Sequence, residues 1–135
     1  MAYTRRNKPG CPLPVEPAVI CTQILNVATA TDYPIYVPWN DCELVYAYAL
    51  TTVASDNNSD VALKFELNAA SGTSLGTMTI TKNSSVGTVT DWTAGTRVRL
   101  SADNTSLDAV NIEIDGDASP SGEFMIYMYF EKYMP

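Results

Sequence analysis

The chain of 135 residues has the length of one domain and carries 15 acidic against 8 basic residues, which gives a net charge of −7. Because phosphate binding needs clustered Lys and Arg side chains, this balance argues against a nucleic-acid groove. The chain has no histidine, which excludes the commonest general base, the usual catalytic triads and most zinc sites.

Residues 1–18 are predicted to form an extended arm. Their sequence, MAYTRRNKPGCPLPVEPA, contains four prolines, which are too closely spaced for a helix and cannot donate to a strand ladder. Three of the eight basic residues lie within the first eight positions: Arg5, Arg6 and Lys8. Residues 9–135 therefore carry a net charge of −10. Together with the apolar Leu13 and Val15, this basic cluster favours an arm laid along the surface of another protein. The alternative is a terminus without a role.

Residues 19–135 are predicted to form one antiparallel β-sandwich of about eight strands, because apolar residues recur with a period of two between turn clusters. The strand-like runs are AVICTQILNVAT, PIYVPW, DCELVYAYALTTV, VALKFEL, GTMTITK, TVTDW, TAGTRVRLS, DAVNIEIDG and EFMIYMYFEKY. No stretch keeps apolar residues at helical spacing between caps. We expect a jelly roll, with an immunoglobulin-like topology as the alternative.

The alternation within the middle strands separates an inward set from an outward set. The residues expected in the core are Val61, Leu63, Phe65, Leu67, Met78, Ile80, Val98, Leu100, Val110, Ile112 and Ile114. Lys64, Glu66, Arg97 and Arg99 alternate with them and are expected to point to solvent.

The closing run EFMIYMYFEKY differs, because both of its faces are apolar. We expect one face in the core, formed by Phe124, Ile126, Met128 and Phe130. The opposite face carries Met125, Tyr127 and Tyr129, and an exposed patch of this kind usually marks a contact surface. These three residues are therefore predicted to mediate self-association. The alternative is a monomer in which the arm or a loop covers the patch.

The run LVYAYAL has the same double character. One of its faces carries Leu44, Tyr46, Tyr48 and Leu50, and the other carries Val45, Ala47 and Ala49. Small apolar residues on the second face permit close approach of two sheets. Because two strands lack a polar side, the simplest arrangement is a homo-oligomer.

Candidate chemistry is restricted to carboxylates and loop aromatics. The acidic stretch EIDGDASPSGE contains Glu113, Asp115, Asp117 and Glu123, but it lacks the ligand spacing of a calcium loop, and Asp-Gly is also a hairpin signal. A glycosidase using two carboxylates, Asp115 and Asp117, is a minor alternative. We predict no catalytic residue, no metal and no cofactor. Four aromatic residues near loops either stack on sugars or close the ends of the sandwich: Tyr33, Tyr36, Trp39 and Trp92.

The three cysteines, Cys11, Cys21 and Cys42, have neither zinc-type nor redox-type spacing and are expected to be free thiols. Prolines interrupt the apolar residues near the N-terminus, and no run approaches the roughly 20 apolar residues of a membrane span. We therefore expect a protein that stays in the cytoplasm after synthesis and has no membrane partner.

The segments DWTAGTRVRLSADN and GEFMIYMYFEKY, within residues 19–135, resemble the decoration (cement) proteins of tailed bacteriophages, several of which are jelly rolls that form trimers on the capsid. The resemblance implies a non-enzymatic structural virion protein on the outer surface of the capsid, assembled in the host cytoplasm. Its partners would be the major capsid protein and, in a homotrimer, further copies of itself. The three cysteines are a departure from the family.

The resemblance also implies roles for particular positions. The capsid-binding arm would use Arg5, Arg6, Lys8, Leu13 and Val15, and self-association would use Met125, Tyr127 and Tyr129. The alternative function is a receptor-binding module of a tail, baseplate or head fibre, in which Trp39 and Trp92 contact carbohydrate.

Overall fold

The computed structural model describes residues 19–27, 32–36, 41–68, 72–103 and 106–133. For residues 19–25, 32–36, 102–103 and 106–107 the description covers the backbone alone. The predicted arm, residues 1–18, lies outside the described residues. Within the described ranges, the regular structure consists of strands. No helix in them has the length and apolar character needed to cross a membrane.

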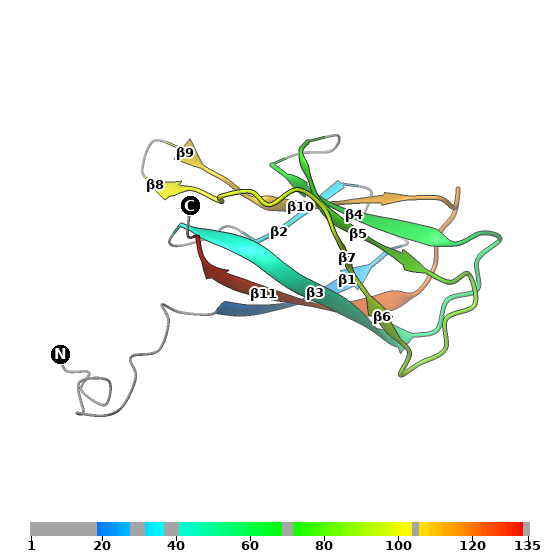
Figure 1. The fold of residues 1–135 in the computed structure, drawn as a ribbon. Coiled ribbons are helices and arrows are strands. Elements are labelled where there is room, and N and C mark those ends of the chain that lie inside the picture. The colour runs from blue at the N-terminus through cyan, green and yellow to red at the C-terminus, as the bar shows by residue number, and fades with distance from the viewer. Residues whose placement is uncertain (1–18, 28–31, 37–40, 69–71, 104–105, 134–135) are drawn as a thin grey trace, which may run out of the picture.

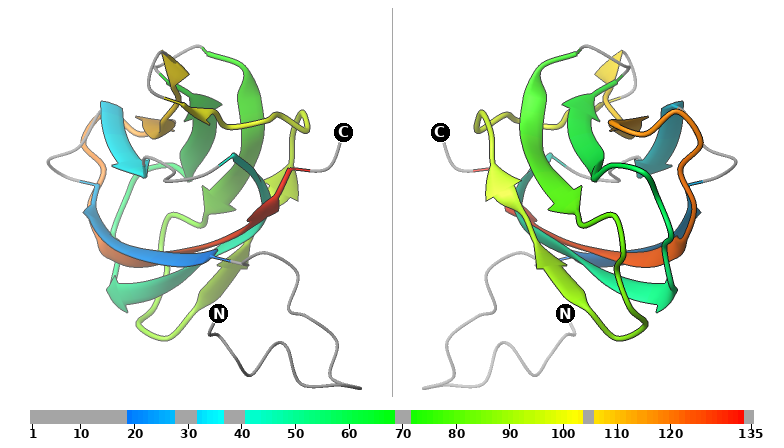
Figure 2. Two further views of the ribbon diagram at one scale, coloured as in Figure 1. Left: turned by 90° about the vertical axis from the view of Figure 1, so that its left-hand side faces the viewer. Right: turned by 90° about the vertical axis from the view of Figure 1, so that its right-hand side faces the viewer.

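Two antiparallel sheets pack face to face and form the sandwich (Figures 1 and 2). The first sheet has the order β1 (Val19–Asn26), β11 (Glu123–Lys132), β3 (Cys42–Val53) and β6 (Val89–Asp91). The second has the order β2 (Asp32–Tyr36), β10 (Val110–Asp115), β4 (Val61–Leu67), β5 (Ser74–Ile80) and β7 (Thr93–Ala94). The short strands β8 (Ala102–Asp103) and β9 (Ser106–Leu107) form a separate antiparallel pair.

The strand order is that of a jelly roll. The pairs β1 with β11, β2 with β10, β3 with β6 and β4 with β5 are nested, as if one long hairpin were folded over on itself. Successive pairs lie alternately in the first and second sheets, which is how a jelly roll divides eight strands between two layers. The predicted all-β sandwich is therefore confirmed, and the immunoglobulin-like alternative is not the observed topology.

The core lies between the two sheets and contains most of the residues that the period-two alternation placed inward. Glu66, expected to point to solvent, is instead buried. The fully buried side chains of the middle strands are Val61, Leu63, Phe65, Met78, Ile80, Leu100, Val110 and Ile112, and those of β11 are Phe124, Ile126, Met128 and Phe130. Leu67, Val98 and Ile114 are partly buried against them. Burial of each large apolar side chain contributes about 1.5–3 kcal/mol, so this layer supplies most of the stability.

One predicted strand is wrong. The run TAGTRVRLS is paired in a ladder only at β7, after which Gly95 N and Thr96 N donate to carbonyls of β5 at 2.9 and 2.8 Å. The chain then leaves the second sheet, and Leu100 forms an isolated bridge with Cys42 of β3, in the first sheet. Because this segment passes from one layer to the other along their open edge, it cannot remain in a single ladder. The expected inward orientation of Leu100 is nevertheless correct.

Trp92 lies between β6 and β7, where the chain passes from the first sheet to the second. Its indole is partly buried against the core and lies over Gly76 of β5, where a β-carbon would overlap the ring at Nε1 and Cε2. Its Nε1 is buried and has no hydrogen-bond partner among the described residues. This position against the core is the one expected if Trp92 fills the side of the sandwich.

Candidate interaction surface

The outer side of the first sheet carries an apolar and aromatic surface formed by its two long strands. We call it the tyrosine face and define it by Tyr46, Tyr48 and Leu50 of β3 and Met125, Tyr127 and Tyr129 of β11. Tyr46 is exposed and the other five are partly buried, whereas the residues that alternate with them, including Ala47, Ala49, Ile126 and Met128, are fully buried. The tyrosine face therefore points away from the protein's own core.

The register of β3 and β11 brings the six residues together. Tyr127 is paired with Tyr48, Tyr129 with Tyr46, and Met125 with Leu50. Residues paired across antiparallel strands present their side chains on the same side of the sheet. Because Ala47 and Ala49 fill the inner side of β3, Tyr46, Tyr48 and Leu50 lie outside, which confirms that this part of the run has two apolar faces. Leu44, expected on the same face as the tyrosines, instead packs against the core. A register shift between Tyr129 and Phe130 interrupts the alternation and pairs Leu44 with the buried Phe130.

The phenol rings contact one another in an ordered arrangement. The rings of Tyr48 and Tyr127 are stacked, with centroids 4.6 Å apart and planes 15° apart. Tyr46 is tilted against Tyr48 at a centroid distance of 5.9 Å. Stacked aromatic pairs contribute about 0.5–1.5 kcal/mol beyond the burial of their area, so the rings are held in place before any partner binds.

The polar edge of the face is formed by Tyr46 and β6. The Tyr46 hydroxyl donates a hydrogen bond of 2.7 Å to Asp91 Oδ1. This bond, with the nearby charge of Asp91, raises the pKa of Tyr46, which therefore stays protonated. Val89 of β6 is paired with Leu50 and is 57% exposed, so the apolar surface continues onto β6.

A shallow cavity of about 190 Å³ opens between the rings. It is lined by Tyr46, Tyr48, Tyr127, Met128 and Tyr129. Nearly all of its wall is carbon, with phenol oxygens as the polar atoms of the surface. Such a groove accepts an apolar or proline-like chain, or the flat face of another ring.

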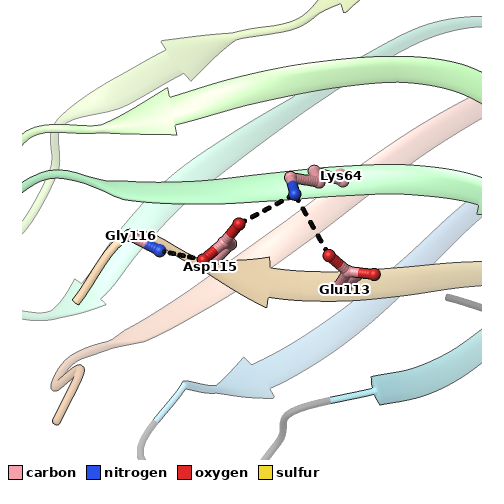
Figure 3. Close-up of polar contacts among 4 residues, drawn as sticks. All are labelled: Lys64, Glu113, Asp115 and Gly116. Carbon is pink, nitrogen blue, oxygen red and sulfur yellow. Dashed lines mark hydrogen bonds and ion pairs between the residues drawn. The ribbon is translucent and has the colours of Figure 1, made fainter. Parts of the chain in front are cut away.

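The carboxylates singled out in the sequence are engaged in ion pairs and hydrogen bonds within the protein. Lys64 Nζ lies 2.8 Å from Asp115 Oδ2 and 3.1 Å from Glu113 Oε1 on the outer side of the second sheet (Figure 3). The bond from Lys64, and a second from the backbone of Gly116, lower the pKa of Asp115. An acid catalyst needs a raised pKa at neutral pH, so Asp115 does not have the properties of a proton donor.

Asp117 joins two loops instead. Its Oδ1 accepts from Ser119 N at 2.8 Å, and its Oδ2 accepts from Asn58 N and Ser59 N at 2.8 and 2.9 Å. These bonds, from Ser119 first and then from Ser59, lower its pKa. Among the described residues, no group of three or more potential ligands is close enough to hold a metal ion. The acidic stretch thus fastens the β10–β11 loop to the β3–β4 loop.

Other predicted site residues are placed only in part. The arm residues Arg5, Arg6, Lys8, Leu13 and Val15, with Cys11 and Trp39, lie outside the described residues, as do the side chains of Cys21, Tyr33 and Tyr36. Cys42 is a free, buried thiol, as predicted. Its burial, and then the charges of Asp41 and Glu43, raise its pKa to about 11. Cys42 is therefore unreactive near neutral pH.

Sequence reasoning identified half of the tyrosine face and missed how the halves meet. Met125, Tyr127 and Tyr129 were expected to lie together on an outer surface, and they do. That Tyr46 and Tyr48 lie directly beside them follows only from the strand order, which places β11 next to β3. The available signal for Tyr46 and Tyr48 was the alternation in LVYAYAL, which places both tyrosines on one face of their strand.

Comparison with known proteins assigns no family, because no family model matches the chain, no curated protein matches its sequence and no solved structure matches its fold.

Proposed function

We propose that this chain is a non-enzymatic structural protein that self-associates through the tyrosine face and decorates the capsid of a tailed bacteriophage. The observation that carries the proposal is the tyrosine face itself: six large apolar or aromatic residues lie on the outer side of a sheet whose inner side is already filled. A soluble monomer rarely exposes such a contiguous patch unless it binds something.

The residue types of the face support an interface rather than a reaction site. Tyrosine and methionine are enriched at the centres of protein interfaces, where charged residues are depleted. Tyrosine also has few rotatable bonds, so fixing it on association costs little conformational entropy. The stacked rings of Tyr48 and Tyr127 are ordered in the single chain, which lowers that cost further.

A closed homo-oligomer, a homotrimer as in the resembling decoration proteins, would cover the face on every copy. The rigid first sheet then holds the copies together, and the arm is left to reach a neighbouring protein. Arg5, Arg6 and Lys8 would bind acidic surface of the major capsid protein. Bridging subunits in this way reinforces a shell by adding buried area and requires no chemistry.

Self-association is tested by replacing Tyr127 with lysine. The full-length wild-type chain is expected to show a mass in multi-angle light scattering that is a multiple of 14.7 kDa, and Tyr127→Lys is expected to show 14.7 kDa. The lysine would place an unpaired charge at the centre of the interface, which is strongly unfavourable. The matched control is Thr79→Lys, an exposed position on the outer side of the second sheet, which should keep the wild-type mass.

Thermal unfolding of both lysine variants separates loss of assembly from loss of folding. A wild-type chain that remains a monomer at high concentration would show that the proposed self-association is wrong. An oligomer that survives Tyr127→Lys would show that a different surface mediates it.

Capsid decoration is tested by sedimentation with heads of the phage that carries the protein, after the protein has been stripped from them. Wild-type protein is expected to sediment with the heads, and the triple variant Arg5→Ala/Arg6→Ala/Lys8→Ala is expected to bind less tightly. The affinity of the wild type should fall as salt is raised, because the contacts are ionic. Electron microscopy of the decorated heads should place the protein on the shell, and its location on the tail instead would contradict the proposal.

A further inference from the structure

The groove in the tyrosine face has the properties of sites that bind proline-rich chains. Domains that recognise polyproline II segments do so with grooves lined by aromatic side chains. Four tyrosines line this one, and two of them, Tyr48 and Tyr127, are stacked on each other. A polyproline II segment makes no internal backbone hydrogen bonds, so its carbonyls remain free to accept. Within the described part of the chain, the hydroxyls of Tyr48, Tyr127 and Tyr129 make no hydrogen bond and are free to donate.

The chain carries a matching sequence immediately before β1. Residues 9–17 read PGCPLPVEP, with Pro9 and Pro12 three residues apart and Pro14 and Pro17 three residues apart. A polyproline II helix has three residues per turn, so each pair would lie along one edge of the helix. Leu13 and Val15 add apolar side chains between the two pairs.

The position of β1 brings this segment to the sheet that carries the groove. Val19 is paired with Phe130, and Ile20 is paired with Tyr129 of the tyrosine face. Nine residues of polyproline II span about 28 Å, whereas crossing four strands requires about 14 Å. Residues 9–17 are thus long enough to cover the groove of a copy packed alongside.

Charge favours binding of this segment over direct packing of two bare sheets. Residues 19–135 contain five basic and 14 acidic residues, so two sandwiches repel each other. Residues 9–17 contain one acidic residue, Glu16, and no basic residue, so they bring much less negative charge to the acidic sandwich than a second sandwich would. An oligomer linked by this segment avoids placing two acidic bodies in direct contact.

We propose that the tyrosine face binds the proline-rich segment of residues 9–17 from a second copy of the chain. The inference rests on the proposed self-association and names what covers the face in the oligomer. Arg5, Arg6 and Lys8 precede the segment, so they would extend beyond the groove and remain available to the capsid.

A second copy is favoured over the chain's own groove because of the prolines. Pro14 and Pro17 hold the backbone extended and disfavour a tight reversal just before Val19. A chain that leaves β1 in the direction of the strand passes the end of its own sheet. When each copy passes its segment to the next copy around a closed ring, every groove in the assembly is also filled.

Cross-linking between two different full-length chains tests this arrangement. One chain keeps its native Cys11. The other carries Cys11→Ser and Val89→Cys, which places a thiol on the exposed β6 position beside Leu50. The two chains are given different tags, expressed together and treated with a flexible bismaleimide. We expect a covalent heterodimer on denaturing gels, because Cys11 of one copy would lie near position 89 of the other.

Two controls identify the thiols that react. Changing Cys11 to serine in the first chain as well should abolish the heterodimer. Any heterodimer that remained would come from Cys21, because Cys42 is buried and unreactive. Moving the second thiol to the opposite sheet with Thr79→Cys, in place of Val89→Cys, should also abolish it.

The outcomes separate this inference from the proposed self-association. An oligomer by light scattering that yields no heterodimer leaves self-association standing and overturns the exchange of segments. The exchange is also overturned if a single chain with both Cys11 and Val89→Cys cross-links only within itself, because the segment then covers its own groove. A wild-type monomer overturns both proposals.

Discussion

Replacing Phe65 with alanine is expected to lower the free energy of unfolding by about 3–5 kcal/mol. The side chain is fully buried at the centre of β4, a strand with neighbours on both sides. Removing the ring eliminates its transfer free energy and leaves a cavity that the two sheets can close only in part. Since small domains have a total stability of about 5–15 kcal/mol, this single change removes a large fraction of it.

Urea denaturation followed by circular dichroism measures the Phe65 effect. The matched control is Thr79→Ala on the adjacent strand β5, where the side chain is exposed, and it should change stability by less than about 0.5 kcal/mol. Comparable losses for the two variants would mean that the inner layer between the sheets is not the main source of stability.

Replacing Gly76 with alanine is expected to displace the indole of Trp92 and to destabilise the protein by about 1–3 kcal/mol. The new β-carbon would overlap the ring at Nε1 and Cε2. The backbone of β5 is fixed by its ladders with β4 and β7, so the indole is the part that must move. In a Trp39→Phe background, the fluorescence of Trp92 should shift to longer wavelength as the ring becomes hydrated.

Two further variants separate the steric effect from backbone strain. Gly87→Ala introduces a side chain at a φ of +90° with no atom within 4 Å of the new carbon, so it should cost some stability without shifting the Trp92 emission. In a Trp92→Ala background, Gly76→Ala should cost clearly less than it does in the wild type. An unchanged cost there would show that the indole is not the obstacle.

The sequence predicted which side chains enter the core because a strand's alternation is a local property. Phe65 and Phe124 are buried where a period of two places them, and Lys64 points outward between its neighbours. The apolar outer side of β11 was predictable for the same reason. The strand that lies beside β11 was not predictable, because the strand order depends on pairings between residues far apart in the chain.

Other features depend on contacts that local pattern does not specify. The run from Thr93 to Ser101 alternates like a strand, yet it passes between the layers, because its pairing is decided by the edges of both sheets. Gly76 was the available signal for the position of Trp92, since an isolated glycine within a strand often marks a close approach. The fastening of two loops by Asp117 had no signal beyond that of ordinary turn residues.

The place of β11 between β1 and β3 has a consequence during synthesis. This strand occupies an interior position of the first sheet although it is synthesised after the other strands of both sheets. Until it arrives, β1 and β3 have no common neighbour, and a sandwich built on such distant pairings forms slowly. Half of the tyrosine face is also missing until β11 has been made, so the proposed self-association would be restricted to molecules in which β11 has been inserted.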